Sequence, residues 1–135
     1  MTDCLFCKIA AGEVPATIVH EDERTLAFMD IHPIARGHCL VIPRAHAADL
    51  LEADPADVAA CAHTVQLLAR RAKDALGADG VTVLQSSGAA AWQSVFHLHF
   101  HVLPRAAGDG IAFPPGAPAP GDPEGIAEAA QALRG

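Results

Sequence analysis

The chain has 135 residues, which is long enough for one hydrophobic core and short for two. Its hydrophobic fraction of 51% is typical of a globular protein, and its net charge of -7 comes with no cluster of Lys or Arg. This balance argues against binding to polynucleotides but is compatible with a nucleotide or another small anion, because a local site can attract phosphate on an acidic protein.

The N-terminal stretch lacks the basic segment and long apolar run of a secretory signal, and no apolar run in the chain reaches membrane-spanning length. We therefore expect a cytoplasmic protein with no membrane partner. In that compartment, four cysteines indicate reduced thiols or a metal site rather than a disulfide framework.

The first half of the chain predicts three strands and one long helix. Strands are expected at 17–22 and 25–31, on either side of an acidic turn, and at 37–43, where a proline closes the strand. Asp54, followed by proline, is typical of a helix N-cap, and Gly77 of a C-terminal stop. Between them, apolar residues recur at helical spacing: Val58, Cys61, Ala62, Val65, Leu68, Ala69, Ala72 and Leu76.

The second half predicts two more strands, at 80–86 and 95–104. Residues 110–123 are rich in proline, which removes backbone donors and argues against regular structure there. Asp122 opens a short final helix that ends near Leu133. The order of elements predicts a mixed α+β fold built on an antiparallel sheet.

We expect the main domain at 1–113, followed by a proline-rich connector and a short C-terminal helix at 114–135.

The stretch "FHLHFHV" places three histidines at alternate positions of the last predicted strand. Because side chains alternate faces along a strand, His97, His99 and His101 are expected on one face and the apolar residues between them on the other. They could be solvated side chains, metal ligands or acid–base and nucleophilic groups. The outer pair lie about 13 Å apart along a strand, so all three are poorly spaced for one ion. Neutral imidazole is a competent nucleophile toward phosphorus near neutral pH.

"HLHFHVLPR", preceded by Gln93, resembles the signature of the histidine triad (HIT) superfamily. "DCLFCKIAAGEVPATIVHED", "TLAFMDIHPIARGHCLVIPRAH" and "SSGAAAWQSVFHLHFHVLPR" also follow in the order and spacing of its Hint-like branch of bacterial type, covering most of residues 3 to 105. The resemblance implies a HIT-like fold: a five-stranded antiparallel sheet with one long and one or more short helices. It also implies a homodimer with a sheet that continues across the interface.

By this resemblance, His99 is the nucleophile that attacks the α-phosphorus of nucleoside 5′-phosphoramidates or related nucleotide esters. A covalent nucleotidyl-histidine then releases a nucleoside monophosphate, and His97 and His101 assist as flanking catalytic residues. The positions matched to a purine nucleotide substrate are Gln93, Ser94 and Ser86 near the phosphate, Asp30 at the ribose, and Leu5, Phe6, Ile9 and Ile31 around the base.

Five of the substrate-binding residues also have a plain structural interpretation. The four apolar residues could be core, and Asp30 could be a turn residue. The loop departs from the family, since many relatives have Asn at the position of Ser86 and glycine at that of Trp92.

Cys4 and Cys7 have the C-x-x-C spacing of zinc sites and redox motifs. The resemblance adds His46 and His97, which implies a closed Cys2His2 site for structural zinc; reduced thiols without a metal are the alternative. No catalytic metal is expected. Three other functions stay open: a dinucleoside polyphosphate hydrolase of the same superfamily, a zinc-dependent hydrolase using strand histidines, and a catalytically weak nucleotide-binding module.

Overall fold

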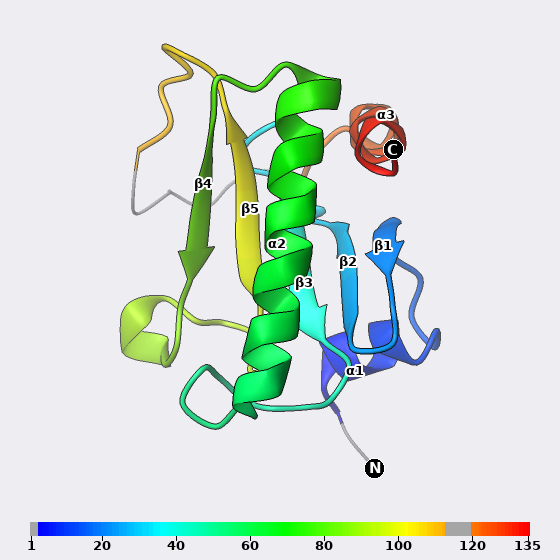
Figure 1. Cartoon of the computed structure of the whole chain (residues 1–135), viewed down its shortest axis with the longest axis vertical. Coiled ribbons are helices and arrows are strands. Elements are labelled where there is room, and N and C mark those ends of the chain that lie inside the picture. Colours follow the sequence, from blue (N-terminus) through cyan, green and yellow to red (C-terminus); the bar gives the residue numbers. More distant parts are fainter. Residues whose placement is uncertain (1–2, 113–119) are drawn as a thin grey trace.

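A five-stranded antiparallel sheet, with strand order β1-β2-β3-β5-β4, organises the computed structural model, which describes residues 3–112 and 120–135 (Figure 1). The predicted fold class is confirmed. In chain order the elements are α1 (Leu5–Ala10), β1 (Ile18–Glu21), β2 (Thr25–Met29), β3 (Cys39–Pro43), α2 (Pro55–Leu76), β4 (Gly80–Gln85), the 3-10 turn η1 (Ala89–Ala91), β5 (Phe100–Arg105) and α3 (Pro123–Leu133).

Helix α2 runs across one face of the sheet (Figure 1). Its N-cap forms as predicted, since the Asp54 side chain accepts a hydrogen bond from the Ala56 amide at 2.8 Å. Gly77 ends it in the left-handed conformation, with φ at 67°. Its buried stripe, which includes Cys61 and Leu68, packs against the residues of β3 that point to this face, Cys39 and Val41. Burial raises the pKa of both cysteines to about 12, so they are core thiols.

The opposite face of the sheet carries a second apolar cluster. The alternate β3 residues Leu40 and Ile42 point to this side and pack with Phe28 and with Phe6 of α1. Helix α1, which the sequence did not predict, begins after Cys4, whose sulfur accepts from the Cys7 amide at 3.3 Å. Six residues are too few for a periodic apolar pattern to stand out.

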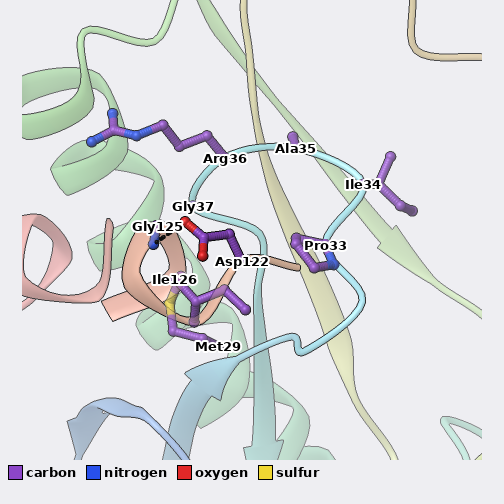
Figure 2. A pocket seen from close by; sticks show the side chains of 9 residues that line it. All are labelled: Met29, Pro33, Ile34, Ala35, Arg36, Gly37, Asp122, Gly125 and Ile126. Carbon is purple, nitrogen blue, oxygen red and sulfur yellow. Dashed lines mark hydrogen bonds between the residues drawn. The ribbon is translucent and has the colours of Figure 1, made fainter. Parts of the chain in front are cut away.

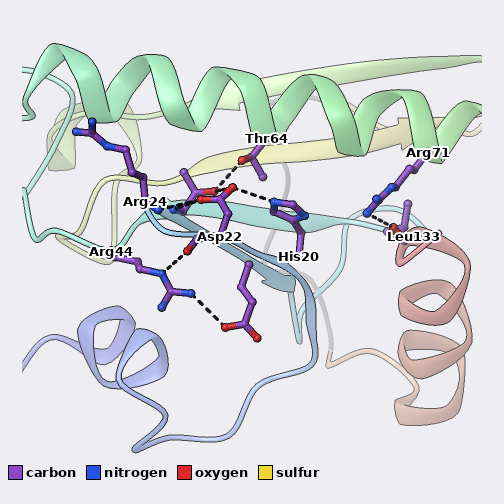
Figure 3. Close-up of polar contacts among 9 residues, drawn as sticks. His20, Asp22, Arg24, Arg44, Thr64, Arg71 and Leu133 are labelled. Atoms are coloured by element: carbon purple, nitrogen blue, oxygen red, sulfur yellow. Dashed lines mark hydrogen bonds and ion pairs between the residues drawn. The ribbon is translucent and has the colours of Figure 1, made fainter.

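The acidic turn between β1 and β2 is fixed by Asp22 (Figure 3). Its carboxylate accepts from the backbone amides of Arg24 and Thr25, at 2.9 Å and 2.8 Å. The Thr25 hydroxyl in turn lies 2.7 Å from that of Thr64 on α2. These bonds tie the β1–β2 hairpin to the long helix.

Strand β5 is shorter than predicted. It begins at Phe100, so His97 and His99 precede it and only His101 lies within it. The segment before the strand pairs elsewhere, since the Leu98 amide donates to the Ala47 carbonyl at 2.8 Å. The expectation of three histidines on one regular strand was therefore wrong.

Helix α3 packs against α2 and beside β1 (Figure 1). Its residues Ala129, Ala130 and Leu133 are buried in the same cluster as α2, and Arg134 Nε donates to the Ile18 carbonyl at 3.0 Å. The domain boundary expected at residue 113, with the first part of the connector, lies outside the described residues and stays a prediction. Across residues 3–112 and 120–135, no helix is both long and apolar enough to cross a bilayer.

Candidate active site

A cavity of about 750 Å³ crosses the α1 side of the sheet from α1 to β4, with His99 and His101 along it. Seven of the eight predicted substrate-binding residues line it: Leu5, Phe6, Ile9, Asp30, Ile31, Ser86 and Ser94. Residues predicted from distant parts of the chain are thus brought to one concave surface.

The α1 end of the cavity is apolar. The Phe6 ring meets those of Phe28 and His99 edge to face, with centroids 5.2 Å apart in each case. Phe6 and Ile9 are buried, whereas Leu5 and Ile31 are 46% and 67% exposed. Core packing therefore accounts for Phe6 and Ile9 but not for the two residues at the mouth.

His99 is held in one tautomer. Its Nδ1 lies 2.8 Å from the backbone carbonyl of His97, and because a carbonyl can only accept, Nδ1 carries the proton. The lone pair is then on Nε2. His99 is buried, and this burial lowers its pKa, which keeps the ring neutral and nucleophilic at neutral pH.

A chain of hydrogen bonds also fixes His101. The Ile34 amide donates to His38 Nδ1 at 3.1 Å, so His38 carries its proton on Nε2, which lies 2.9 Å from His101 Nδ1. Nε2 of His101 therefore keeps a proton that it can donate into the cavity. Asp30, 3.5 Å from His38 Nε2, adds a carboxylate to this chain.

Sequence reasoning missed His38, which is buried and lines the same cavity. The sequence did contain a signal for it, because side chains alternate faces along the strand predicted at 37–43 and His38 therefore shares a face with Leu40 and Ile42. Only the pairing of Leu40 with His101 across β3 and β5 brings that face to the site.

His97 takes a different place from the one predicted for a flanking catalytic residue. Its Nε2 lies 2.8 Å from the Pro43 carbonyl and its Nδ1 lies 3.3 Å from Cys4 Sγ, so neither ring nitrogen faces the cavity. It reaches His99 through its backbone carbonyl. Its predicted help with the phosphate stays a prediction, and the contact to His99 is the one through which it could position that ring.

The structure gathers Cys4, Cys7, His46 and His97 so that their ligand atoms lie within 4.8 Å of one another. Cys7 Sγ lies 3.3 Å from His46 Nδ1 and 3.4 Å from His97 Nδ1, and the two nitrogens are 3.3 Å apart. A tetrahedral zinc ion with ordinary bond lengths separates its ligands by about 3.3–3.8 Å. Nε2–H of His97 donates to the Pro43 carbonyl, so Nδ1 has the lone pair that a metal ligand needs. The donor set fits zinc.

Gln93 also differs from its prediction as a phosphate contact. Its Oε1 accepts from the Gly88 amide at 2.7 Å, and its Nε2 donates to the carbonyls of Ala48 and Val95. Gln93 is buried and does not line the cavity. Its hydrogen bonds stabilise the loop that contains Gly88, next to the site.

Trp92 is the only residue other than glycine with positive φ among the described residues, at 81°. It follows η1, and its amide donates to the Ala89 carbonyl at 3.0 Å. Glycine adopts this conformation freely, whereas a residue with a Cβ pays about 1–2 kcal/mol. The side chain is 61% exposed and lines the cavity.

A smaller cavity of about 270 Å³ lies behind the loop that carries Asp30, between Pro33 and the start of α3 (Figure 2). Here the Gly121 amide donates to the Ile31 carbonyl at 2.9 Å. A Cβ on Gly121 would lie 2.7 Å from the Pro33 ring. The C-terminal segment therefore supports the loop that borders the large cavity.

The HIT domain family matches residues 11–108. The chain is 41% identical over 102 residues to adenosine 5′-monophosphoramidase hnt1 of Schizosaccharomyces pombe, covering 76% of this chain and 74% of that protein. It is 42% identical over 103 residues to adenylylsulfatase HINT3 of Arabidopsis thaliana, covering 76% of this chain and 52% of that longer protein.

A zinc-bound histidine triad family protein from Mycobacterium smegmatis has a similar structure. The TM-score is 0.89 at 42% identity, with 98% of this chain and 91% of that chain covered. Family match, sequence identity and structural similarity agree with the histidine-lined cavity and the sheet described above. The chain belongs to the HIT family.

Proposed function

We propose that this protein is a nucleotide hydrolase that cleaves nucleoside 5′-phosphoramidates, or related nucleotide esters, at the α-phosphorus. The observation that carries the proposal is the hydrogen bond from His99 Nδ1 to the His97 carbonyl, which leaves the Nε2 lone pair of a neutral imidazole beside a large cavity. Two relatives, named as an adenosine 5′-monophosphoramidase and an adenylylsulfatase, are in keeping with this chemistry.

In the proposed reaction, His99 Nε2 attacks the α-phosphorus and the bond from phosphorus to the leaving group breaks. The departing atom takes up a proton from solvent. Water then attacks the same phosphorus, the bond to Nε2 breaks, a proton returns to solvent, and the nucleoside monophosphate leaves. The Nε2 proton of His101 and the hydroxyl of Ser94 would donate to the phosphate oxygens as charge develops on them.

The rest of the substrate follows from the cavity walls. The apolar α1 end around Phe6 accepts a purine base, with Leu5 and Ile31 closing over it at the mouth. The Asp30 carboxylate accepts from the ribose hydroxyls. Ser86 is near the phosphate and offers a shorter hydrogen-bonding group than an amide.

We infer that Cys4, Cys7, His46 and His97 hold a structural zinc ion. Four protein ligands leave no open position for substrate, so the metal would tie α1 to the segment before β5 without taking part in the reaction. We also infer a homodimer, because β4 is an edge strand of the sheet and Val83 on it is 46% exposed.

The test is release of AMP from adenosine 5′-phosphoramidate, with adenosine 5′-phosphosulfate and diadenosine tetraphosphate as competing substrates. Wild-type protein should hydrolyse the phosphoramidate or phosphosulfate faster than the tetraphosphate, and His99→Ala should lose at least about a thousandfold in kcat. His63→Ala, which changes an exposed histidine on α2, is the matched control and should keep full activity.

Mass spectrometry of rapidly quenched wild-type protein should show a nucleotidyl adduct that His99→Ala lacks. Normal turnover by His99→Ala would refute the assignment of the nucleophile. Preference for the tetraphosphate would move the protein to the dinucleoside polyphosphate class, and nucleotide affinity without turnover would make it a binding module.

A further inference from the structure

We propose that Trp92 selects substrates whose leaving group is an amine with a flat apolar substituent, such as benzylamine. This inference rests on the proposed function, since it concerns the part of the substrate that departs.

The position of Trp92 follows from the direction of the cavity. The cavity runs across the sheet, with Leu5 and Phe6 of α1 at one end and Leu84 of β4 and Trp92 at the other. Figure 1 shows α1 and the turn at Ala89–Ala91 on opposite sides of the same end of the sheet.

The histidines divide this cavity into two halves. His101 lies on β5, which is between β3 and β4 in the sheet, and its ring centroid is 5.1 Å from that of His99. With a base at the α1 end and the phosphorus at His99, the remaining substituent on phosphorus points toward β4 and Trp92. The leaving group departs roughly opposite to the attacking atom, so it occupies this half.

The backbone of Trp92 argues that the indole is there for a ligand. Its φ of 81° lies in the left-handed region, which glycine enters without strain, whereas every other positive φ among the described residues belongs to a glycine. Core burial does not compensate for the strain, because the side chain is 61% exposed. A strained residue with an exposed aromatic ring at a cavity wall points to a contact made only when that cavity is filled.

The chemistry of this half fits a flat, apolar group. The indole offers a broad face, Leu84 adds an apolar surface, and Ser86 and Ser94 also line the cavity. Aromatic pairs stack or meet edge to face in such surroundings and gain about three- to tenfold in affinity.

Trp92 is the single tryptophan of the chain, so intrinsic fluorescence reports on this residue alone. We would titrate His99→Ala protein, which does not form the nucleotidyl adduct, with adenosine 5′-N-benzylphosphoramidate and, separately, with unsubstituted adenosine 5′-phosphoramidate. The benzyl compound should shift the emission to shorter wavelength as the indole leaves water. The unsubstituted compound should leave the emission nearly unchanged. His99→Asn replaces the alanine variant if the latter does not fold.

Kinetics give a second readout. Trp92→Gly should lower kcat/KM for the benzyl compound about three- to tenfold relative to the unsubstituted one, and Trp92→Phe should recover most of that ratio. The glycine variant should melt no lower than wild type, since glycine relieves the backbone strain. Phe96→Ala, at an aromatic residue that is 50% exposed and absent from the cavity lining, should leave the ratio unchanged.

An unchanged ratio in Trp92→Gly, or the same emission with both compounds, overturns the proposal. An emission change on dilution of the protein, with none on ligand addition, would also overturn it and assign Trp92 to a subunit contact. If wild-type protein turns over neither compound, the proposed function fails, and the fluorescence titration still decides whether Trp92 contacts the benzyl group.

Discussion

Nε2 of His38 donates to Nδ1 of His101 at 2.9 Å, so the residue just before β3 determines which nitrogen of a β5 histidine faces the cavity. His38 is buried and is itself oriented by the Ile34 amide. It acts through His101, which makes it a positioning residue.

His38→Ala should therefore lower kcat about 10–100-fold while KM changes little, because the His101 ring loses its fixed tautomer and orientation. His38→Gln should recover part of the loss, since an amide can donate to His101 Nδ1. Steady-state kinetics on adenosine 5′-phosphoramidate measure the separate effects on kcat and KM. His63→Gln is the control, and an equal rise of KM in His38→Ala would indicate a substrate contact in place of a positioning role.

The second prediction concerns stability at acidic pH. Burial, with His38 and His99 nearby, lowers the pKa of His101 from 6.5 to about 4 despite the opposing charge of Asp30. Between these values the unfolded chain binds a proton at this site that the folded chain does not, so stability falls as pH drops from about 6.5 to about 4.

Urea unfolding at pH 7 and pH 4.5 measures this loss. His101→Gln should reduce the fall in unfolding free energy by roughly 2 kcal/mol relative to wild type, because a shift of one pKa unit is about 1.4 kcal/mol. His63→Gln should behave as wild type. The same pH dependence in His101→Gln and wild type would show that His101 titrates normally in the folded protein.

The third prediction separates structural from catalytic zinc. Purified protein should contain about one zinc per chain, and Cys4→Ser should lose it. Loss should lower the melting midpoint by roughly 5–10 °C, while kcat at 20 °C stays within about threefold as long as the protein is folded. Cys61→Ser, at a buried cysteine outside the cluster, is the control for metal content. Activity that disappears from folded, zinc-depleted protein and returns with added zinc would favour the metal-dependent hydrolase.

The fourth prediction concerns the contact between the C-terminal segment and the loop 30–37. Gly121→Ala places a Cβ 2.7 Å from Pro33 and 2.9 Å from Ile126, so this loop or the start of α3 must shift. Because Asp30 and Ile31 lie on the loop, KM should rise several-fold with a smaller change in kcat. Gly125→Ala, whose Cβ would have its nearest contact at 3.4 Å, is the matched control. Equal kinetics in the two variants would mean that the contact does not support the site.

The fifth prediction concerns assembly. If the β4 edges pair, Val83→Lys should halve the mass measured by analytical ultracentrifugation, because it places charge at the interface. Leu51→Lys, at a residue that is 86% exposed elsewhere on the surface, should leave the mass unchanged. A wild-type monomer, or a dimer that survives Val83→Lys, would exclude this interface.

Much of the fold follows from local rules. Proline and glycine bound the strands near their observed ends, and the caps at Asp54 and Gly77 define α2. The start of β5 could not be predicted from local rules, because the Leu98 amide donates to the carbonyl of Ala47, some 50 residues away. Local pattern contains no information on that partner.

The sequence predicted the site residues that belong to a motif. It did not predict side-chain directions that depend on packing in the folded chain. His99 and Asp30 lie at the cavity as expected. His97 and Gln93 turn away because Pro43 and Ala48 offer carbonyl acceptors that only the folded chain brings near. His38 belongs to no motif, and its role depends on the pairing of β3 with β5.

Helix α3 has a consequence for the proposed pairing of chains. The two borders of the sheet are β1 and β4, and α3 lies beside β1, where Arg134 occupies the Ile18 carbonyl. If two chains pair through β4, as we propose, each is left with β1 as its other border, where α3 and Arg134 of the described residues lie against the strand. In the proposed assembly, the helix that completes the core would also oppose growth of the sheet from β1 into a fibre.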